Sequence, residues 1–118
     1  MSEARERGKA ACVHAHRALS YRHTRILIIR SLVPNTFCSG ADLKERQSMS
    51  PGQVDRFLTD LRRTLSALER LPMPTMAALD GLAMGGGMEL ALCADLRIAD
   101  EKADKLGLPE TRLGIIPG

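Results

Sequence analysis

Two glycine-rich turns limit the folds open to this chain more than any other feature of its sequence. They are Ser39-Gly40-Ala41-Asp42 and Gly85-Gly86-Gly87. Each follows a buried, strand-like run and leads into a helix-like run, where backbone N–H groups lack partners and the helix dipole favours negative charge. Two such N–H groups that converge on one point would form an oxyanion hole, which stabilises the charge that develops in acyl-group chemistry.

Other uses remain open for either turn taken alone. Glycines at a helix start often serve tight packing, and this explanation is favoured for each turn by itself. Phosphate binding competes, but the sequence lacks the pattern G-x-x-x-x-G-K-[ST]. The dinucleotide pattern G-x-G-x-x-G also fails, because Leu90 occupies the position of its last glycine. A dinucleotide-binding unit is therefore excluded.

The apolar patterning predicts an α/β fold with a parallel sheet. Residues 25–31 (RILIIRS) place adjacent apolar side chains between charged flanks, which is typical of a strand buried on both faces. The later segments predict, in order, a loop over 32–40, a short helical turn over 41–47, a strand over 75–80, a helix over 88–94, a strand over 96–99 and a loop or turn over 109–118. Strands that alternate with helices indicate a parallel sheet.

The clearest helix follows Ser50. Ser50 can cap it, Pro51 suits the first helical position, and Gln53 completes a Ser-x-x-Gln capping box. Apolar residues then recur at spacings of three and four along one face, at Val54, Phe57, Leu58, Leu61, Leu65, Leu68 and Leu71. Pro72 and Pro74 end this helix.

Composition excludes several classes of function. A length of 118 residues is enough for one small domain. One Tyr, two Phe and no Trp are too few to stack single-stranded nucleic acid, and a net charge of +3 suits an anionic small molecule as well as a polyanion. Three cysteines without a C-x-x-C pair predict neither a disulfide framework nor a zinc site, and no apolar run reaches the ~20 residues of a membrane span. His14 and His16 lack further spaced ligands, so we expect no metal site.

Two glutamates are the candidates for acid–base chemistry. Glu89 lies one helical turn beyond Gly86 amid apolar residues, a setting that suits proton transfer. Glu110 follows Gly107 and Pro109 in a loop that could return to the same place. Two carboxylates beside an oxyanion hole could hold a water molecule between them. The alternative is that Glu89 is an acid favoured by the helix dipole and Glu110 a surface residue.

Three motifs in order carry a resemblance to a known family. The first motif runs from Phe37 to Glu45 (FCSGADLKE). The second lies between Pro74 and Ala99 and consists of PTMAALDG, GGGMELA and DLRIA. The third runs from Gly107 to Gly118, from GLPE to GIIPG. Together they resemble the signatures of the enoyl-CoA hydratase/isomerase (crotonase) superfamily. The resemblance implies a partial ClpP/crotonase fold of repeated β-β-α units and a lyase that acts on acyl-CoA thioesters.

The resemblance also assigns residues to roles. It implies an oxyanion hole made by the backbone N–H groups of Ala41 and Gly86, with Glu89 and Glu110 as the catalytic carboxylates. Substrate-binding positions would be Ser39, Gly40, Asp42, Leu43, Lys44 and Gly85. The implied reaction adds water across an α,β-unsaturated thioester, or removes it, while the hole holds the enolate oxygen. No separate cofactor or metal is expected, because coenzyme A is part of the substrate.

The motifs are most similar to the methylglutaconyl-CoA hydratase branch. That branch implies a mitochondrial protein of leucine degradation or fatty acid metabolism and an association with AU-rich RNA. The family as a whole implies a homotrimer or hexamer, and no membrane partner is expected. The resemblance covers residues 25–118 and leaves 1–24 as a non-matching segment that is disordered or serves targeting. This segment is rich in Arg, His and Ala, but Glu3 and Glu6 argue against a transit peptide.

Family members continue beyond the last motif, so we expect a truncated core that is inactive by itself. Two other functions stay open. One is an enoyl-CoA isomerase. The other is an RNA-binding module using Lys44, Arg46, Arg56, Arg62 and Arg63. The scarcity of aromatic residues and the interleaved acids Glu45, Asp55 and Asp60 weigh against the RNA-binding module.

Overall fold

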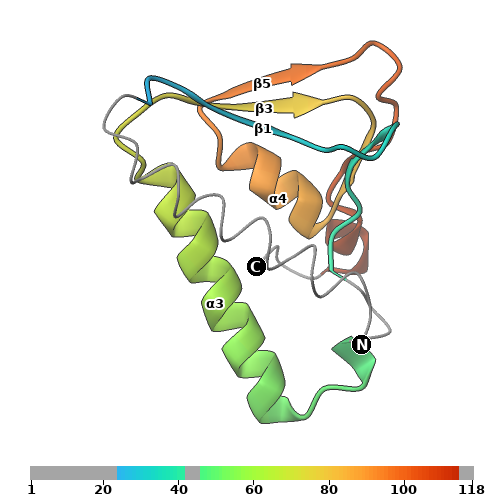
Figure 1. Ribbon diagram of the computed structural model, residues 1–118. Helices are drawn as coiled ribbons and strands as arrows, with labels where there is room; N and C mark the ends of the chain where they lie inside the picture. The colour runs from blue at the N-terminus through green and yellow to red at the C-terminus, as the bar shows by residue number, and fades with distance from the viewer. Residues whose placement is uncertain (1–23, 42–45, 115–118) are drawn as a thin grey trace.

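Two three-stranded parallel sheets and a short helix, α4 (Gly86–Leu92), form the centre of the molecule. The computed structural model describes residues 24–41 and 46–114. The first sheet has the order β1 (Leu27–Arg30), β3 (Thr75–Leu79), β5 (Leu96–Ala99), and the second has the order β2 (Thr36–Cys38), β4 (Leu82–Met84), β6 (Leu106–Gly107). Helix α4 lies under the first sheet (Figure 1) and contacts β2 and β4 of the second.

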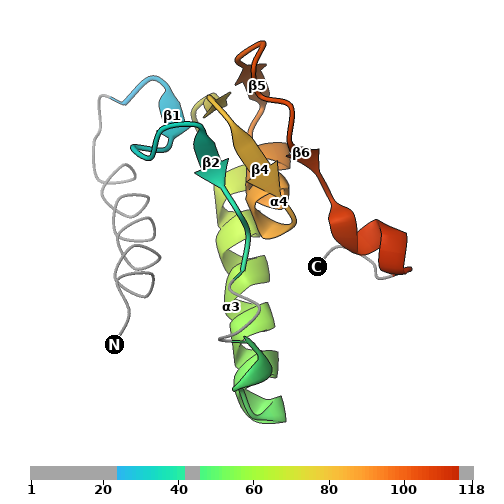
Figure 2. The same ribbon diagram turned by 90° about the vertical axis from the view of Figure 1, so that its right-hand side faces the viewer.

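The chain alternates between the two sheets. Each odd-numbered strand joins the first sheet, the next strand joins the second, and a helical segment follows. These segments are α3 (Pro51–Glu69) after β2, α4 after β4, and the 3-10 helix η1 (Pro109–Leu113) after β6. Figure 2 shows β2, β4 and β6 side by side as the second sheet. The predicted parallel α/β fold of repeated β-β-α units is confirmed.

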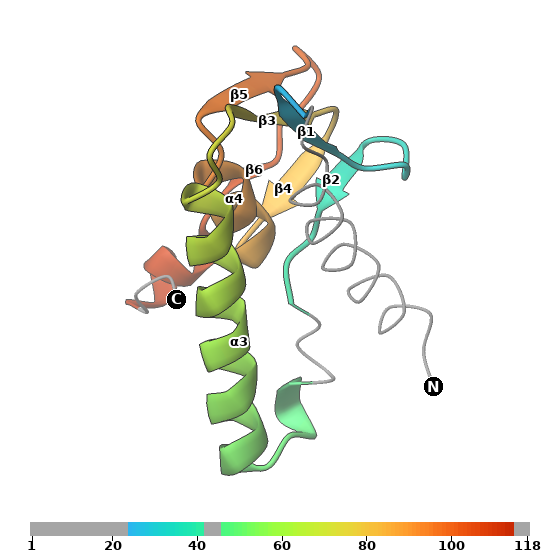
Figure 3. The same cartoon turned by 60° about the vertical axis from the view of Figure 1, so that its left-hand side comes forward.

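Helix α3 begins where the sequence predicts it. The Gln53 side chain accepts a hydrogen bond of 2.8 Å from the Ser50 N–H, and Pro51 is the first helical residue. The residues of the predicted apolar face are all buried or half-buried, with Leu68 the most buried. The first turns of α3 extend away from both sheets (Figures 1 and 3), and the helix ends at Glu69, two residues before the predicted end.

Three short strands depart from the sequence prediction. The loop expected over 32–40 contains β2, and β4 and β6 were not expected as strands. They have three, three and two residues, too few for an alternating pattern to appear in a sequence. Residues 46 and 47 are helical as expected, and the rest of that predicted turn lies partly outside the described residues.

Among the described residues, one face of the first sheet is covered at β1 and β3, whereas every residue of β5 is exposed. Burial alternates along β1, so the prediction of a strand buried on both faces is wrong. Ile28 is 53% exposed on β1, and Leu96 and Ile98 on β5 are 53% and 58% exposed. The register sets Ile28, Met76 and Leu96 in one row across the three strands. The prediction fails because α4 packs against one face of the sheet, which leaves the apolar side chains of the outer face exposed to solvent.

Small side chains let α4 approach the sheets closely. The core consists of Phe37, Ala77, Leu79, Ala83, Ala91 and Ala94. Gly87 is buried on α4, and a Cβ at this position would overlap the carbonyl oxygen of Cys38 on β2. The glycine is therefore needed for a close approach of helix and strand, and it fixes α4 directly beside the end of β2.

Candidate active site

The two glycine-rich turns meet at one edge of the second sheet. Because β2 and β4 are parallel neighbours, their carboxyl ends lie side by side, and each is followed by one turn. Gly40 has a φ of +87°, and a Cβ there would lie 2.8 Å from the Met84 carbonyl oxygen and 3.3 Å from the Gly86 nitrogen. Only glycine allows this backbone conformation and this proximity together. The two glycine-rich turns therefore lie against each other at this edge of the second sheet.

Two backbone amides border the point where the turns meet. A Cβ at Gly86 would lie 4.0 Å from the Ala41 nitrogen and 3.9 Å from the Gly40 Cα. The helical hydrogen bonds of α4 begin with the N–H groups of Met88 and Glu89, which both donate to the Gly85 carbonyl oxygen. The Gly86 amide precedes these bonds at the start of the helix. The Gly86 and Ala41 amides are thus next to each other, as an oxyanion hole requires.

Both predicted carboxylates lie beside the same pair of glycines. The Glu89 Oε2 atom is 3.5 Å from the position that a Cβ on Gly86 would occupy. The Glu110 Oε2 and Oε1 atoms are 3.7 and 3.8 Å from the corresponding position on Gly85. Glu89 belongs to the first turn of α4 and Glu110 to η1, and both side chains are half-buried. Two acids from distant parts of the chain therefore border one small site.

A backbone hydrogen bond holds the segment of Glu110 in place. The Gly85 N–H donates to the Gly107 carbonyl oxygen at 3.0 Å, which joins the turn before α4 to the end of β6. Since η1 starts at Pro109, two residues later, this bond fixes the start of the helix that carries Glu110. Sequence reasoning missed the contributions of Gly107 and of the Met84 carbonyl, because backbone oxygens leave no residue-type signal.

The other predicted binding positions are placed less fully. Ser39 follows β2 and is exposed, and Gly40 is half-buried beside the second turn. Asp42, Leu43 and Lys44 lie outside the described residues. No group of three or more His, Cys, Asp and Glu side chains suited to a metal ion occurs within 24–41 and 46–114. In the same ranges, no helix has both the length and the apolarity to cross a membrane.

Two ionisable groups near the end of α4 have shifted pKa values. Burial, together with the charge of Glu69, raises the pKa of the Cys93 thiol to about 11. Hydrogen bonds from the side chain and backbone of Thr75 hold the pKa of the Asp95 carboxyl below its usual value. Both groups lie at the end of α4 away from the glycine turns, so they belong to the support of the site and not to its reacting atoms.

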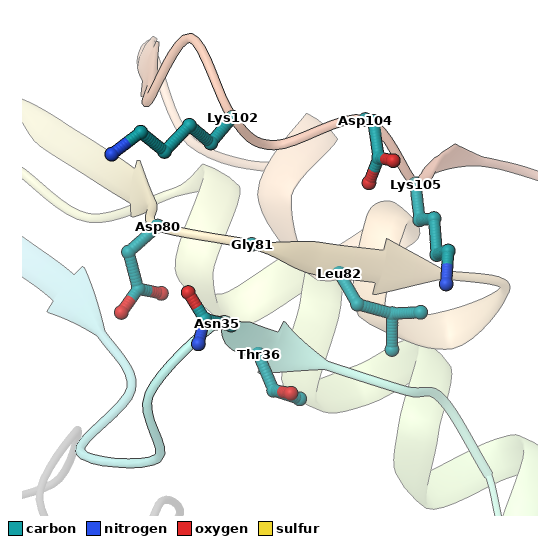
Figure 4. Close-up of a pocket in the computed structure, with 8 residues that line it drawn as sticks. All are labelled: Asn35, Thr36, Asp80, Gly81, Leu82, Lys102, Asp104 and Lys105. Atoms are coloured by element: carbon teal, nitrogen blue, oxygen red, sulfur yellow. The ribbon is translucent and has the colours of Figure 1, made fainter.

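A separate pocket of about 360 Å³ lies at the other end of the second sheet (Figure 4). Thr36 and Leu82, the first residues of β2 and β4, line it. Its other lining residues are Asn35, Asp80, Gly81, Lys102, Asp104 and Lys105. The two lysines and two aspartates give no net preference for an anion or a cation. No predicted site residue lines this pocket, so it is distinct from the glycine turns.

Comparisons with known proteins agree with this geometry. Residues 12–118 match the sequence pattern of the enoyl-CoA hydratase/isomerase family. An enoyl-CoA isomerase/hydratase of Mycosarcoma maydis is 58% identical over 94 residues, which are 80% of this chain and 34% of that protein. The mitochondrial methylglutaconyl-CoA hydratase of Homo sapiens is 54% identical over 99 residues, 84% of this chain and 29% of that protein. The chain thus spans about a third of the length of these relatives.

Solved structures share the fold. The crystal structure of an enoyl-CoA hydratase from Bacillus anthracis superimposes with a TM-score of 0.83 at 43% sequence identity, and the match covers 93% of this chain and 42% of that one. A second enoyl-CoA hydratase structure, from Geobacillus kaustophilus, gives a TM-score of 0.82 at 33% identity. The two parallel sheets with α4 beside them are therefore an arrangement that occurs in experimentally determined structures.

Proposed function

Because the chain belongs to the enoyl-CoA hydratase/isomerase family, we propose that it provides the oxyanion hole and both acid–base carboxylates of a hydratase for α,β-unsaturated acyl-CoA thioesters. One observation carries this proposal: Glu89 and Glu110 both border the Gly85–Gly86 pair, next to the Ala41 amide. A hydratase needs two proton-transfer groups and an oxyanion hole at one place, and these residues supply all three.

The proposed reaction follows from these positions. A thioester carbonyl oxygen between the Ala41 and Gly86 N–H groups accepts two hydrogen bonds. One glutamate takes a proton from a bound water molecule, whose oxygen forms a bond to the β-carbon. The electron pair of the carbon–carbon double bond moves toward the thioester oxygen, where the two amides stabilise the enolate. The other glutamate, in its protonated form, gives a proton to the α-carbon, and the sum is addition of one water.

Isomerisation is the second candidate, since one relative is named as both an isomerase and a hydratase. Moving a double bond needs a single group that takes a proton from one carbon and returns it to another. The presence of Glu110 beside Gly85 favours hydration, because a second carboxylate has no necessary part in that shuttle. The two reactions differ in their products, so one assay separates them.

The test is a chimera that places this site in a full-length relative. Residues 24–118 replace the matching segment of the human methylglutaconyl-CoA hydratase, and hydration and isomerisation of unsaturated acyl-CoA substrates are measured. The control carries Glu89→Gln and Glu110→Gln together. We expect hydration at least about 1000-fold above the control. A folded chimera that binds acyl-CoA without hydrating it would contradict the proposal, and isomerised product alone would favour the second candidate.

The cellular setting is proposed on the same basis. The human relative and an Arabidopsis thaliana relative, 54% and 56% identical over the matched regions, are named as mitochondrial. We propose that this protein also acts in mitochondria, on an acyl-CoA substrate and as a homotrimer or hexamer. Cell fractionation tests the location, and light scattering of the purified natural protein tests the oligomeric state. A cytosolic protein, or a monomer at assay concentration, would overturn the corresponding proposal.

A further inference from the structure

Thr75 and Asp95 form a reciprocal set of hydrogen bonds at the end of α4. The Asp95 Oδ2 atom accepts from the Thr75 N–H and from the Thr75 hydroxyl, both at 2.8 Å. The Thr75 Oγ1 atom in turn accepts from the Asp95 N–H at 2.9 Å. Thr75 is 2% exposed and is the first residue of β3. These bonds therefore tie the corner between α4 and β5 to the start of the central strand of the first sheet.

Arg97 fixes the same end of α4 in a second way. Its Nη1 atom donates to the carbonyl oxygens of Ala94 and Leu92, at 2.6 and 3.3 Å. Leu92 is the last residue of α4, where carbonyl groups lack helical partners and the helix dipole favours a positive charge. Arg97 lies on β5, so the cation also anchors the helix end to the edge strand of the first sheet.

The other end of α4 carries the proposed catalytic groups. The Gly86 amide starts the helix, and Glu89 lies in its first turn. A helix of seven residues spans about 10 Å and moves as a unit. A shift of its far end would therefore displace the Gly86 amide from the Ala41 amide. Misplacement of a reacting or stabilising group by about 1 Å can cost about 100-fold in rate.

We propose that Thr75, Asp95 and Arg97 are positioning residues, which set the place of the Gly86 amide and the Glu89 carboxylate by holding the opposite end of α4. This inference rests on the proposed hydratase function. Within residues 24–41 and 46–114, none of the three residues reaches the glycine turns through a hydrogen bond of its own; they act through the helix. Their contribution should therefore appear in turnover and not in substrate affinity.

The test is a graded series of variants in the chimera. Thr75→Val keeps the shape of the side chain and removes every hydroxyl bond to Asp95, and Asp95→Ala removes the acceptor. We expect kcat to fall about 10- to 100-fold with KM changed less than about threefold, because the oxyanion donor acts mainly in the transition state. Thr75→Ser restores the hydroxyl and should recover most of kcat. Asp100→Ala is the matched control, since its Oδ1 atom accepts only a local bond from the Lys102 N–H in an exposed turn.

A second measurement separates this inference from the proposed function. Hydrogen exchange of the amides of residues 86–89 reports the order of the start of α4 without any substrate. Exchange there should be about tenfold faster in Thr75→Val than in the wild type, with Thr75→Ser close to the wild type. An inactive wild-type chimera with this exchange pattern would overturn the proposed function alone.

Three results would overturn the positioning proposal. The first is an active chimera in which Thr75→Val and Asp95→Ala keep wild-type kcat. The second is a loss of activity in proportion to the loss of folded protein, with kcat per folded molecule unchanged. The third is unchanged exchange at residues 86–89. If Asp95→Ala fails to fold, Asp95→Asn takes its place: one oxygen still accepts, so kcat should fall less than in Thr75→Val.

Discussion

The thiol of Cys93, at the end of α4, interacts with the carboxylate of Glu69, at the end of α3. The two residues come from different β-β-helix units of the chain. Because Cys93 is half-buried, and because the negative charge of Glu69 opposes a thiolate, the pKa of the thiol rises from 9.0 to about 11. The Cys93 thiol is thus neutral at physiological pH.

This pKa predicts slow alkylation of Cys93. A raised pKa keeps the thiol protonated to higher pH, so at pH 8.5 its thiolate fraction is about 100-fold lower in the folded protein than in the unfolded one. Iodoacetamide labelling followed by peptide mass spectrometry should show that ratio between native and urea-treated protein. Glu69→Gln removes the charge and should speed labelling of the native protein. Equal rates with and without urea would show that the thiol is not shielded.

The Ala41 amide predicts different outcomes for two substitutions. Ala41→Ser keeps the N–H and should leave turnover nearly unchanged, since the exposed side chain has room. Ala41→Pro removes the N–H and should cost about 100- to 1000-fold in kcat, the usual loss of one oxyanion donor. Both are measured in the chimera with an unsaturated acyl-CoA. If the two variants have the same turnover and both are folded, Ala41 does not contribute its amide.

The carboxylates predict a separation of rate from affinity. Glu89→Gln and Glu110→Gln keep the shape of each side chain but remove the base, so each should lower hydration by about two to four powers of ten. Affinity for acyl-CoA should change much less, because both amides remain. Stopped-flow hydration and calorimetric binding give the two quantities. Full activity of Glu110→Gln would reassign the site to single-acid chemistry such as isomerisation.

The close contact at Gly87 predicts a large effect of one methyl group. In Gly87→Ala the new Cβ would overlap the Cys38 carbonyl oxygen, so α4 must move away from β2. We expect a loss of about 1–3 kcal/mol in the free energy of unfolding, as in other overpacked cores. Gly52→Ala is the matched control: no atom lies within 4 Å of its new Cβ, and alanine in α3 should stabilise by up to about 1 kcal/mol. Urea unfolding measures both, and equal stability of the two variants would contradict the prediction.

Elements with a strong local pattern were predicted well from the sequence. Helix α3 has a capping box and seven apolar residues on one face, and its start at Pro51 was predicted to the residue. The strands β2, β4 and β6 were missed because they are short and exist only through pairing with distant neighbours. The outer face of β1 was misjudged because a run of isoleucines shows that a strand is apolar but not which helix covers it.

The candidate site shows the same division. Its proposed residues, Gly40, Ala41, Gly86, Glu89 and Glu110, were predicted from residue types and motifs, and they lie close together in the structure. The residues that hold the site in place were not predicted. Thr75 and Asp95 stand far apart in the sequence, and a pair of polar residues acquires meaning only when the fold sets them at 2.8 Å. Backbone oxygens such as that of Gly107 carry no residue-type signal at all.

The alternation of strands between the two sheets has a consequence for how the chain reaches its fold. Among the described residues, no strand pairs with the strand that follows it in sequence, so none of the sheet hydrogen bonds comes from a hairpin. In the described part of the chain, β1 pairs only with β3, which follows β2 and all of α3 in the sequence. Each pairing must close a long loop before it gains any hydrogen bonds, which gives the chain a high contact order and slow folding. On a ribosome, β1 must therefore wait for the whole of α3 to be synthesised before it meets its partner.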